Sequence, residues 1–324
     1  MGRKSLPADL YLLSKVSKLY YEEELTQQEI ALKLHLSRPK VSRLVQQAEK
    51  EGIVQITVRP PQGTYPDIEY RLEKKFNLRD VEVIEVLESD NQETVSRELG
   101  IAAANYFQRT IQDGDIIGIS WGKTLSAMVN ALQPMPVNNV HVVQMIGGLG
   151  YPEAEVHATS LCRRMTQLLN SKLTLLPAPG IVDNVNVKEA IFTDSHMLRV
   201  LEFFARINVA YVGVGAPTPD SVVMRGARIM SQEDVSLLKA KGAVGDIALR
   251  FFDCLGQPII SELDERVIGI SLEQLKKVDH VIGVTGGPQK HDVVLGAVSG
   301  GLIDVLITDL GTARYLLDKP FLQA

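Results

Sequence analysis

The sequence of 324 residues predicts an α/β protein with an N-terminal winged helix-turn-helix and a larger, doubly wound, Rossmann-like domain. Residues 26–47 carry two short helical patterns around a tight corner, which is typical of a helix-turn-helix. Residues 59–66, RPPQGTYP, have the composition of a linker. From residue 81 onward, apolar strand-like runs alternate with helical stretches, which indicates a parallel sheet covered on both faces. We therefore expect domains at residues 1–59 and 60–324.

The helix-turn-helix prediction depends on caps and on the spacing of apolar residues. Thr26 and Glu29 have the spacing of a capping box, and Ser37 can cap a second helix whose first turn accommodates Pro39. His35 occupies the corner, where positive φ is often required. The expected inward-facing residues are Ile30, Ala31 and Leu34 of the first helix and Val41, Leu44, Val45 and Ala48 of the second.

The outward face of the second helix is basic and polar. Its side chains suit phosphate oxygens and base edges, and a helix N-terminus can hold a backbone phosphate. A solvated helix with a few positive charges is the alternative, but the complete pair of capped helices favours binding to double-stranded DNA. The residues expected at the DNA are Thr26, Gln27, Ser37, Arg38, Pro39, Lys40, Ser42, Arg43 and Gln46.

Two flanking segments complete the predicted head. Residues 8–24 have a helical stripe that would pack behind the DNA-reading pair, and residues 53–58, IVQITV, alternate as the strand of a wing. Arg59, at the end of this strand, could reach a phosphate or could be an ordinary surface residue.

Composition limits the possible classes of protein. The head carries 10 Lys and Arg against 7 Asp and Glu, a net charge of +3, whereas the remainder carries 24 against 32, a net charge of −8. This distribution suits specific docking on DNA rather than general coating of nucleic acid. We find no membrane span, no secretory signal and only two cysteines, so we expect a cytoplasmic protein with no metal site.

The body is expected to begin with a helix at residues 67–76. Strands are expected at residues 81–86, 116–119, 140–146, 173–176, 209–214, 278–284 and 302–308. Helices are expected near residues 94–110, 123–132, 155–169, 196–206, 231–241, 288–298 and 311–318.

A small ligand is expected beyond the carboxyl ends of these strands, where loops lead into helix N-termini. Glycine-bearing loops lie at residues 120–124, 147–150, 213–216, 242–246, 286–290 and 308–312. Glycine lets backbone N–H groups approach phosphate oxygens, while Ser120, Thr124 and Lys290 add donors and Asp246 can accept from sugar hydroxyls. Any one loop could need glycine for turn geometry alone, but the six together favour a site for a phosphorylated polyol.

Two enzymatic motifs are weaker. Residues 118–122 match G-x-S-x-G, the nucleophile elbow of hydrolases, but neither His280 nor His291 is placed to complete a triad. The run Gly213-x-Gly215-x-Pro217 lacks the third glycine of the dinucleotide fingerprint. We therefore expect no catalytic residues and no cofactor.

The order of motifs over residues 10–317 resembles the SorC/DeoR-type sugar-responsive transcriptional regulators of bacteria. The motifs are LTQQEIA, LSRPKVSRL, DIIGISWGKTL, VQMIGG, GAVGDI, GVTGG-x-x-K and LITDLGTA. The resemblance implies an effector domain like sugar-phosphate isomerases, binding of a free or phosphorylated sugar, and a dimer or homotetramer on operator DNA. An active isomerase or deaminase with an added DNA-binding domain is the alternative, and an architectural DNA-binding protein would leave the glycine loops without a role.

The resemblance also implies which residues line the effector pocket. They are Ser120, Trp121, Gly122, Lys123 and Thr124, with Gly147 and Gly148 opposite, Lys290 toward a phosphate, Asp246 toward sugar hydroxyls, and Asp183 and Asn184 at the border. Some members of the family have a lysine directly before the Gly-Gly pair that can form an imine with an aldehyde sugar. Because Ile146 stands there in this chain, we expect reversible binding.

Overall fold

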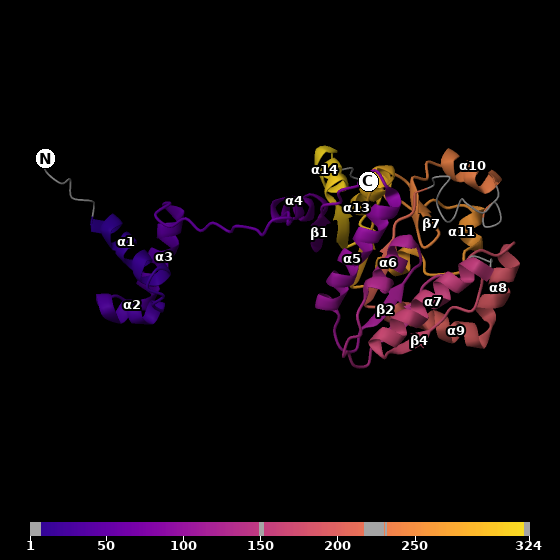
Figure 1. The fold of residues 1–324 in the computed structure, drawn as a ribbon, viewed down its shortest axis with the longest axis horizontal. Coiled ribbons are helices and arrows are strands. Elements are labelled where there is room, and N and C mark those ends of the chain that lie inside the picture. The colour runs from indigo at the N-terminus through magenta and orange to yellow at the C-terminus, as the bar shows by residue number, and fades with distance from the viewer. Residues whose placement is uncertain (1–7, 149–151, 217–229, 231, 321–324) are drawn as a thin grey trace. The chain divides into compact units, whose positions relative to one another are not determined.

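The computed structural model describes residues 8–148, 152–216, 230 and 232–320 (Figure 1). Leu149 and Gly150 of one expected loop lie outside these residues, as does Pro217 of the run compared with the dinucleotide fingerprint. The chain forms two compact units, Met1–Pro61 and Gln62–Ala324, so the division falls two residues beyond the expected one. Each unit is described by itself.

The N-terminal unit is a three-helix domain with α1 at Ala8–Tyr21, α2 at Gln27–Leu34 and α3 at Arg38–Lys50. Its core is formed by Val16, Ile30, Ala31, Val41 and Val45. The capping box is confirmed, because the Thr26 N–H donates to Glu29 Oε2 at 2.8 Å and the Glu29 N–H donates to Thr26 Oγ1 at 3.3 Å. His35 ends α2 with φ of 51°, the left-handed geometry expected at the corner.

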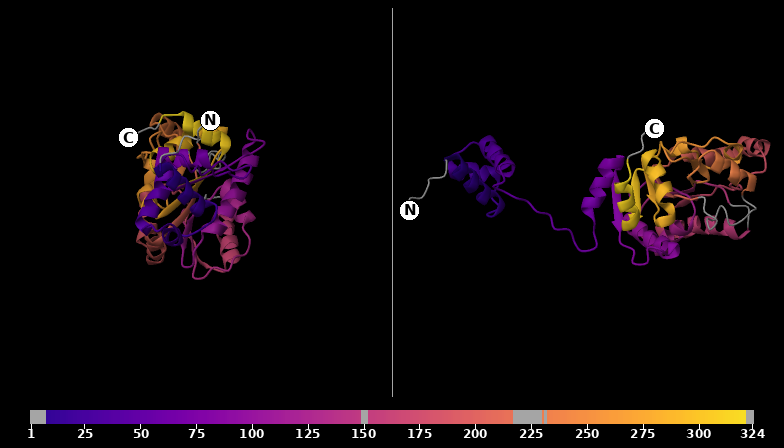
Figure 2. Two further views of the ribbon diagram at one scale, coloured as in Figure 1. Left: turned by 90° about the vertical axis from the view of Figure 1, so that its left-hand side faces the viewer. Right: turned by 90° about the horizontal axis from the view of Figure 1, so that it is seen from above.

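The predicted wing strand is wrong. The N–H groups of Ile53 and Val54 both donate to the Ala48 carbonyl, at 2.9 and 3.2 Å, and so close the end of α3. Beyond them the chain continues without a helix or strand (Figure 2). The physical reason is that a strand needs a neighbour for its main-chain groups, and the described part of this unit provides none.

The larger unit contains a seven-stranded parallel sheet, in its described residues, with the order β1-β9-β8-β5-β2-β3-β4. The strands are β1 Asp80–Ile84, β2 Ile116–Ile119, β3 His141–Gln144, β4 Lys172–Thr174, β5 Val209–Gly213, β8 His280–Val284 and β9 Val305–Asp309. All seven expected strands are therefore confirmed, with ends that differ by a few residues.

Helices cover both faces of this sheet, as a doubly wound fold requires (Figure 1). On β5, Tyr211 packs in one apolar cluster with α5, α6 and α7, whereas Ala210 and Val212 pack in the other with α4, α13 and α14. The helical segments are α4 Pro66–Phe76, α5 Gln92–Thr110, α6 Lys123–Ala131, α7 Pro152–Leu169, α8 Val185–Thr193, α9 Ser195–Leu201, η1 Glu202–Arg206, α10 Gln232–Ala240, α11 Glu262–Arg266, α12 Leu272–Leu275, η2 Pro288–Lys290, α13 His291–Ser299 and α14 Leu310–Asp318.

A small antiparallel hairpin was not predicted from the sequence. Its strands are β6 Gly245–Ile247 and β7 Arg250–Phe252, and its turn consists of Ala248 and Leu249, with φ of 53° and 62°. Strands of three residues are too short to show an alternating pattern, and such a turn normally contains Asn or Gly. The helices α8, α11 and α12 were also not predicted.

Candidate DNA-reading helix and effector site

The exposed face of α3 carries the predicted DNA contacts. Arg38, Lys40 and Arg43 are exposed, whereas Val41 and Val45 are buried on the opposite side of the helix. In the described part of the chain these three cations form no ion pair, so their charge is available to phosphates or bases. The structure is therefore compatible with α3 as the reading helix.

Thr26 and Ser37 differ in their availability for DNA. The Thr26 hydroxyl both accepts from the Glu29 N–H and donates to Glu29 Oε2 at 2.7 Å, so it stabilises α2. Ser37 has the backbone geometry of an N-cap, but its side chain makes no capping hydrogen bond, contrary to expectation. The exposed Ser37 hydroxyl and the first turn of α3 are therefore open to a phosphate.

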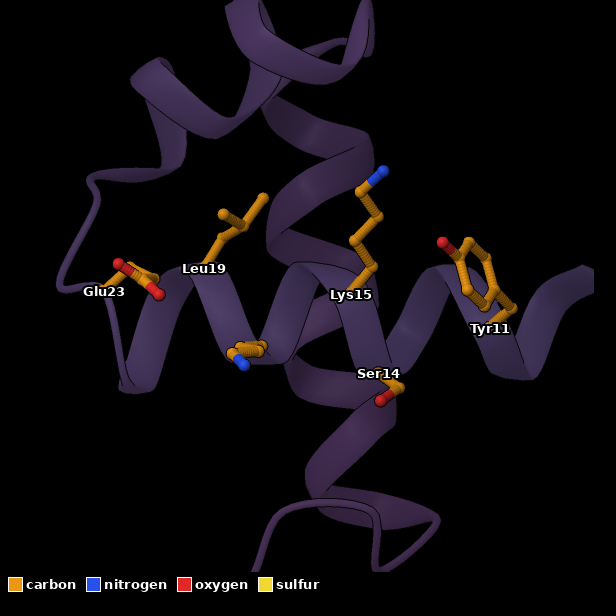
Figure 3. A pocket seen from close by; sticks show the side chains of 6 residues that line it. Tyr11, Ser14, Lys15, Leu19 and Glu23 are labelled. Carbon is orange, nitrogen blue, oxygen red and sulfur yellow. The ribbon is translucent and has the colours of Figure 1, made fainter.

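A shallow groove runs along α1 and contains none of the predicted site residues. Figure 3 shows Tyr11, Lys15 and Leu19 along this helix, and Glu23 follows its C-terminal end. The Lys15 ammonium lies 5.9 Å from the centre of the Tyr11 ring, which is an ordinary surface contact. With one helix supplying most of the lining, the groove lacks the opposing wall that a small-molecule site needs.

The predicted effector loops meet where the connections of the main sheet reverse direction. From β2 the chain continues to β3 on one side, and from β5 it continues to β8 on the other. Such a reversal opens a crevice at the carboxyl ends of the strands. Ser120 lies there, since it follows β2 and its Oγ accepts from the Gly213 N–H of β5 at 3.3 Å.

The N-terminus of α6 lies beside Ser120. Gly122 is its N-cap residue, with φ of 145°, and no side chain caps the first turn. A Cβ at this position would meet no described atom within 4 Å, so the glycine is required by its φ and not by crowding. Lys123 is exposed and Thr124 is buried. An uncapped first turn with adjacent hydroxyl and ammonium groups is suited to an anion.

Trp121 contributes an unpaired donor to the same loop. Its indole Nε1 is buried and has no hydrogen-bond partner in the described part of the structure. An indole N–H without an acceptor costs free energy, so a ligand oxygen would stabilise it.

Asp246 and Lys290 both contact the end of β5, although they come from separate elements. Gly215 exchanges main-chain hydrogen bonds with Asp246 at 2.8 and 2.9 Å. The Lys290 ammonium donates to the Val214 carbonyl at 2.7 Å. Three consecutive residues therefore each contact one predicted effector residue. Gly213 contacts Ser120, Val214 contacts Lys290, and Gly215 contacts Asp246.

The Asp246 carboxyl has unusual acidity. Burial raises the pKa of this carboxyl to about 6. The Leu249 N–H, which donates to the carboxyl at 3.1 Å, and the charge of Lys290 both lower the pKa. Burial lowers the pKa of Lys290, and Asp246 partly offsets this. A carboxyl that changes protonation near pH 6 can either accept from or donate to a ligand hydroxyl.

Three of the four remaining predicted effector residues, Gly147, Gly148 and Asn184, have clear structural roles. A Cβ on Gly147 would lie 2.5 Å from the Ala178 carbonyl oxygen, and Gly148 pairs with Pro179, so these glycines permit a close chain approach. Asn184 caps α8 by accepting from the Val187 N–H at 3.2 Å, and Asp183 is exposed beside it. Contact of these four residues with an effector stays a prediction.

Comparison with known proteins agrees with both units. A family model described as "Putative sugar-binding domain" matches residues 61–318, and one described as "Winged helix-turn-helix DNA-binding" matches residues 19–55. The chain belongs to the SorC/DeoR-type sugar-binding transcriptional regulators. Like the other members, this SorC/DeoR regulator is a DNA-binding transcriptional regulator and not an enzyme.

Individual relatives align with nearly the whole of this chain. The deoxyribonucleoside regulator of Bacillus subtilis is 34% identical, with 94% of this chain and 96% of the relative covered. The sorbitol operon regulator of Klebsiella pneumoniae is 30% identical, with 95% and 98% covered. The crystal structure of the full-length Klebsiella regulator matches with a TM-score of 0.73 at 28% identity, covering 97% of this chain and 100% of that chain.

The G-x-S-x-G motif of this SorC/DeoR regulator is not a nucleophile elbow. Among the described residues no histidine bonds to Ser120, whose Oγ accepts from Gly213. His280 begins β8, so it lies at the amino end of its strand, and it contacts Arg79. His291 stacks on Tyr315, with ring centres 4.4 Å apart. The motif reflects the turn from β2 into α6.

One polar cluster at the same edge was not assigned from the sequence. The Asp309 carboxylate accepts from the Gly287 N–H at 2.6 Å, from the Thr312 hydroxyl at 2.6 Å and from the Thr312 N–H at 2.9 Å. Asp309 therefore ties the loop after β8 to the start of α14. The available signal was an aspartate three residues before a threonine at a helix start.

Proposed function

We propose that this regulator controls a carbohydrate-utilisation operon by coupling a sugar or sugar-phosphate site to operator DNA. The observation that carries the proposal is the run Gly213–Gly215, along which Ser120, Lys290 and Asp246 converge. The site combines a hydroxyl, an ammonium and a carboxyl with the uncapped start of α6. This is the chemistry of a polyol that carries an anionic group.

The relatives support a carbohydrate as the effector class. One name refers to deoxyribonucleosides, which contain a sugar, and another refers to the sorbitol operon. Sorbitol is a polyol. Position 146, before the Gly-Gly pair, is a fully buried isoleucine. We therefore propose that binding is reversible, and that the protein uses no cofactor.

Regulation requires that effector binding reaches the DNA. We propose that the protein acts in the cytoplasm as a homotetramer built from two-fold dimers. A dimeric helix-turn-helix reads two half-sites about 34–36 Å apart, so a change in subunit arrangement can prevent simultaneous docking.

Two substitutions test the two sites separately. We expect Arg43→Ala to weaken operator binding by about fivefold or more, because a base contact by arginine is worth about 1–3 kcal/mol. The same variant should retain the rise in melting temperature produced by the effector sugar. Gel-shift titration and thermal-shift screening against paired free and phosphorylated sugars measure the two effects.

Lys290→Ala should give the opposite result, with intact operator binding and loss of the thermal shift. The exposed residues Arg97 and Lys172, each changed to alanine, are matched controls for the loss of a cation. An Arg43 variant with wild-type operator affinity would exclude α3 as the reading helix, and a Lys290 variant with the wild-type sugar response would exclude the effector site.

A further inference from the structure

The segment that follows α3 exposes apolar side chains without a partner. Ile56 is 67% exposed and Val58 is 82% exposed. In the described structure, no main-chain hydrogen bond involves residues 55–59. Branched apolar residues that alternate with Gln and Thr are typical of a strand, and a strand requires a partner.

The bonds at the end of α3 determine which edge of this segment is free. The Val54 N–H is directed back to Ala48 of its own unit. Successive N–H groups of an extended chain point to opposite edges, so Gln55 and Thr57 present their N–H and C=O groups on the outer edge.

The apolar and polar positions of residues 54–58 are arranged symmetrically about Ile56. Val54 and Val58 flank it at equal distance, with Gln55 and Thr57 between them, and the run 53–58 contains no charge. A two-fold contact places each residue of one copy opposite its symmetric counterpart on the other, and this pattern satisfies that condition without opposing like charges.

We propose that residues 54–58 of two copies of this chain pair as an antiparallel ribbon centred on Ile56. Ile56 lies opposite Ile56 of the second copy in a non-hydrogen-bonded pair, and Val54 lies opposite Val58. Gln55 and Thr57 then exchange the main-chain hydrogen bonds on both sides of the axis. This register leaves the Val54 N–H on its own helix, as observed.

The ribbon has a direct consequence for DNA reading. Residues 51–53 alone separate the segment from α3, so a two-fold axis at Ile56 also relates two recognition helices. A ribbon of two strands is marginal in isolation, and the effector units of an oligomer would keep the two segments at high local concentration.

Cysteine cross-linking in the full-length protein tests this register. The exposed Cys254 is first changed to serine, while the buried Cys162 is retained. Ile56→Cys then gives each copy a thiol at a position where the two Cα atoms are about 4.5 Å apart, which is within the range of a disulfide. We expect rapid formation of a covalent dimer under mild oxidation, measured by non-reducing electrophoresis.

Gln55→Cys and Val58→Cys are the matched controls. In the proposed register, each is separated from its own counterpart by roughly 8 Å or more, beyond the limit of a disulfide. Val58 is also more exposed than Ile56, so random collision would favour Val58→Cys. We expect Ile56→Cys to cross-link at least tenfold faster than either control. Equal rates at the three positions, or no dimer at position 56, would overturn the proposal.

Operator binding gives a second measurement. The oxidised Ile56→Cys dimer should bind operator DNA at least as tightly as the reduced protein, since the cross-link preserves the proposed geometry. Ile56→Lys should weaken operator binding tenfold or more at an unchanged melting temperature. Loss of DNA binding on cross-linking would show that the ribbon is incompatible with the DNA-bound arrangement.

Discussion

Asp246 is a buried carboxyl with a structural role at the β6–β7 turn and a predicted role in binding the effector. One oxygen accepts the Leu249 N–H at the hairpin turn, and the other lies against Gly215, where a Cβ would approach it to 2.1 Å. Any side chain at Gly215 would therefore displace the carboxyl. Burial raises the pKa of Asp246 to about 6, so the charge of this carboxyl changes near pH 6.

The acidity of Asp246 predicts a specific pH dependence of stability. Because the folded-state pKa is raised above the ordinary 3.8, the folded protein holds the proton more tightly. As the pH rises from 4 to about 6, stability on the order of 2 kcal/mol is lost. Asp246→Asn removes this loss. The melting temperature of the variant minus that of wild type should therefore be higher at pH 7 than at pH 4.

The measurement is a series of thermal melts without effector. The exposed Asp183, changed to asparagine, is the control for the removal of a surface carboxyl. A difference between Asp246→Asn and wild type that stays constant over this pH range would contradict the raised pKa of Asp246.

At the scale of elements, the β6–β7 turn is a strained feature beside Asp246. Ala248 and Leu249 both have left-handed backbone geometry, and neither is glycine. Left-handed geometry costs about 1–2 kcal/mol for such residues. The turn persists because Leu249 is buried and its N–H is bound by Asp246.

Ala248→Gly should therefore stabilise the protein by about 0.5–1 kcal/mol, as glycine adopts this geometry without a clash. Ala190→Gly, on the exposed face of α8, is the matched control and should destabilise it by about 1 kcal/mol. Denaturant melts measure both changes. If both variants lost stability equally, the strain assigned to this turn would be incorrect.

For the whole molecule, charge is separated between the head and the rest of the chain. Residues 1–59 carry a net charge of +3, and the rest of the chain carries −8. No helix in the described residues is long and apolar enough to cross a membrane. An acidic remainder repels polyanions, so we expect contact with DNA to be confined to the head.

Coupling between the two units must be reciprocal. If the effector changes operator affinity by some factor, operator DNA must change effector affinity by the same factor, about 5- to 150-fold for 1–3 kcal/mol. Calorimetric titration of the effector sugar, with and without operator duplex, measures this. A scrambled duplex of equal length is the control. Identical effector affinity with operator and scrambled DNA would contradict allosteric control.

The sequence by itself determined the capped helix pair of the head and the seven strands of the main sheet. Capping residues, such as Thr26 with Glu29, are local, so the helix-turn-helix was visible without a structure. The seven strands were equally visible, because strands buried on both faces consist of continuous apolar runs.

Only the tertiary structure decided what the strand ends bring together. Ser120, Asp246 and Lys290 are far apart in sequence, and their convergence on Gly213–Gly215 depends on strand order, which no local pattern contains. The same reason explains the failed wing prediction. Residues 53–58 have the pattern of a strand, but pairing needs a partner, and the described structure of one chain contains none.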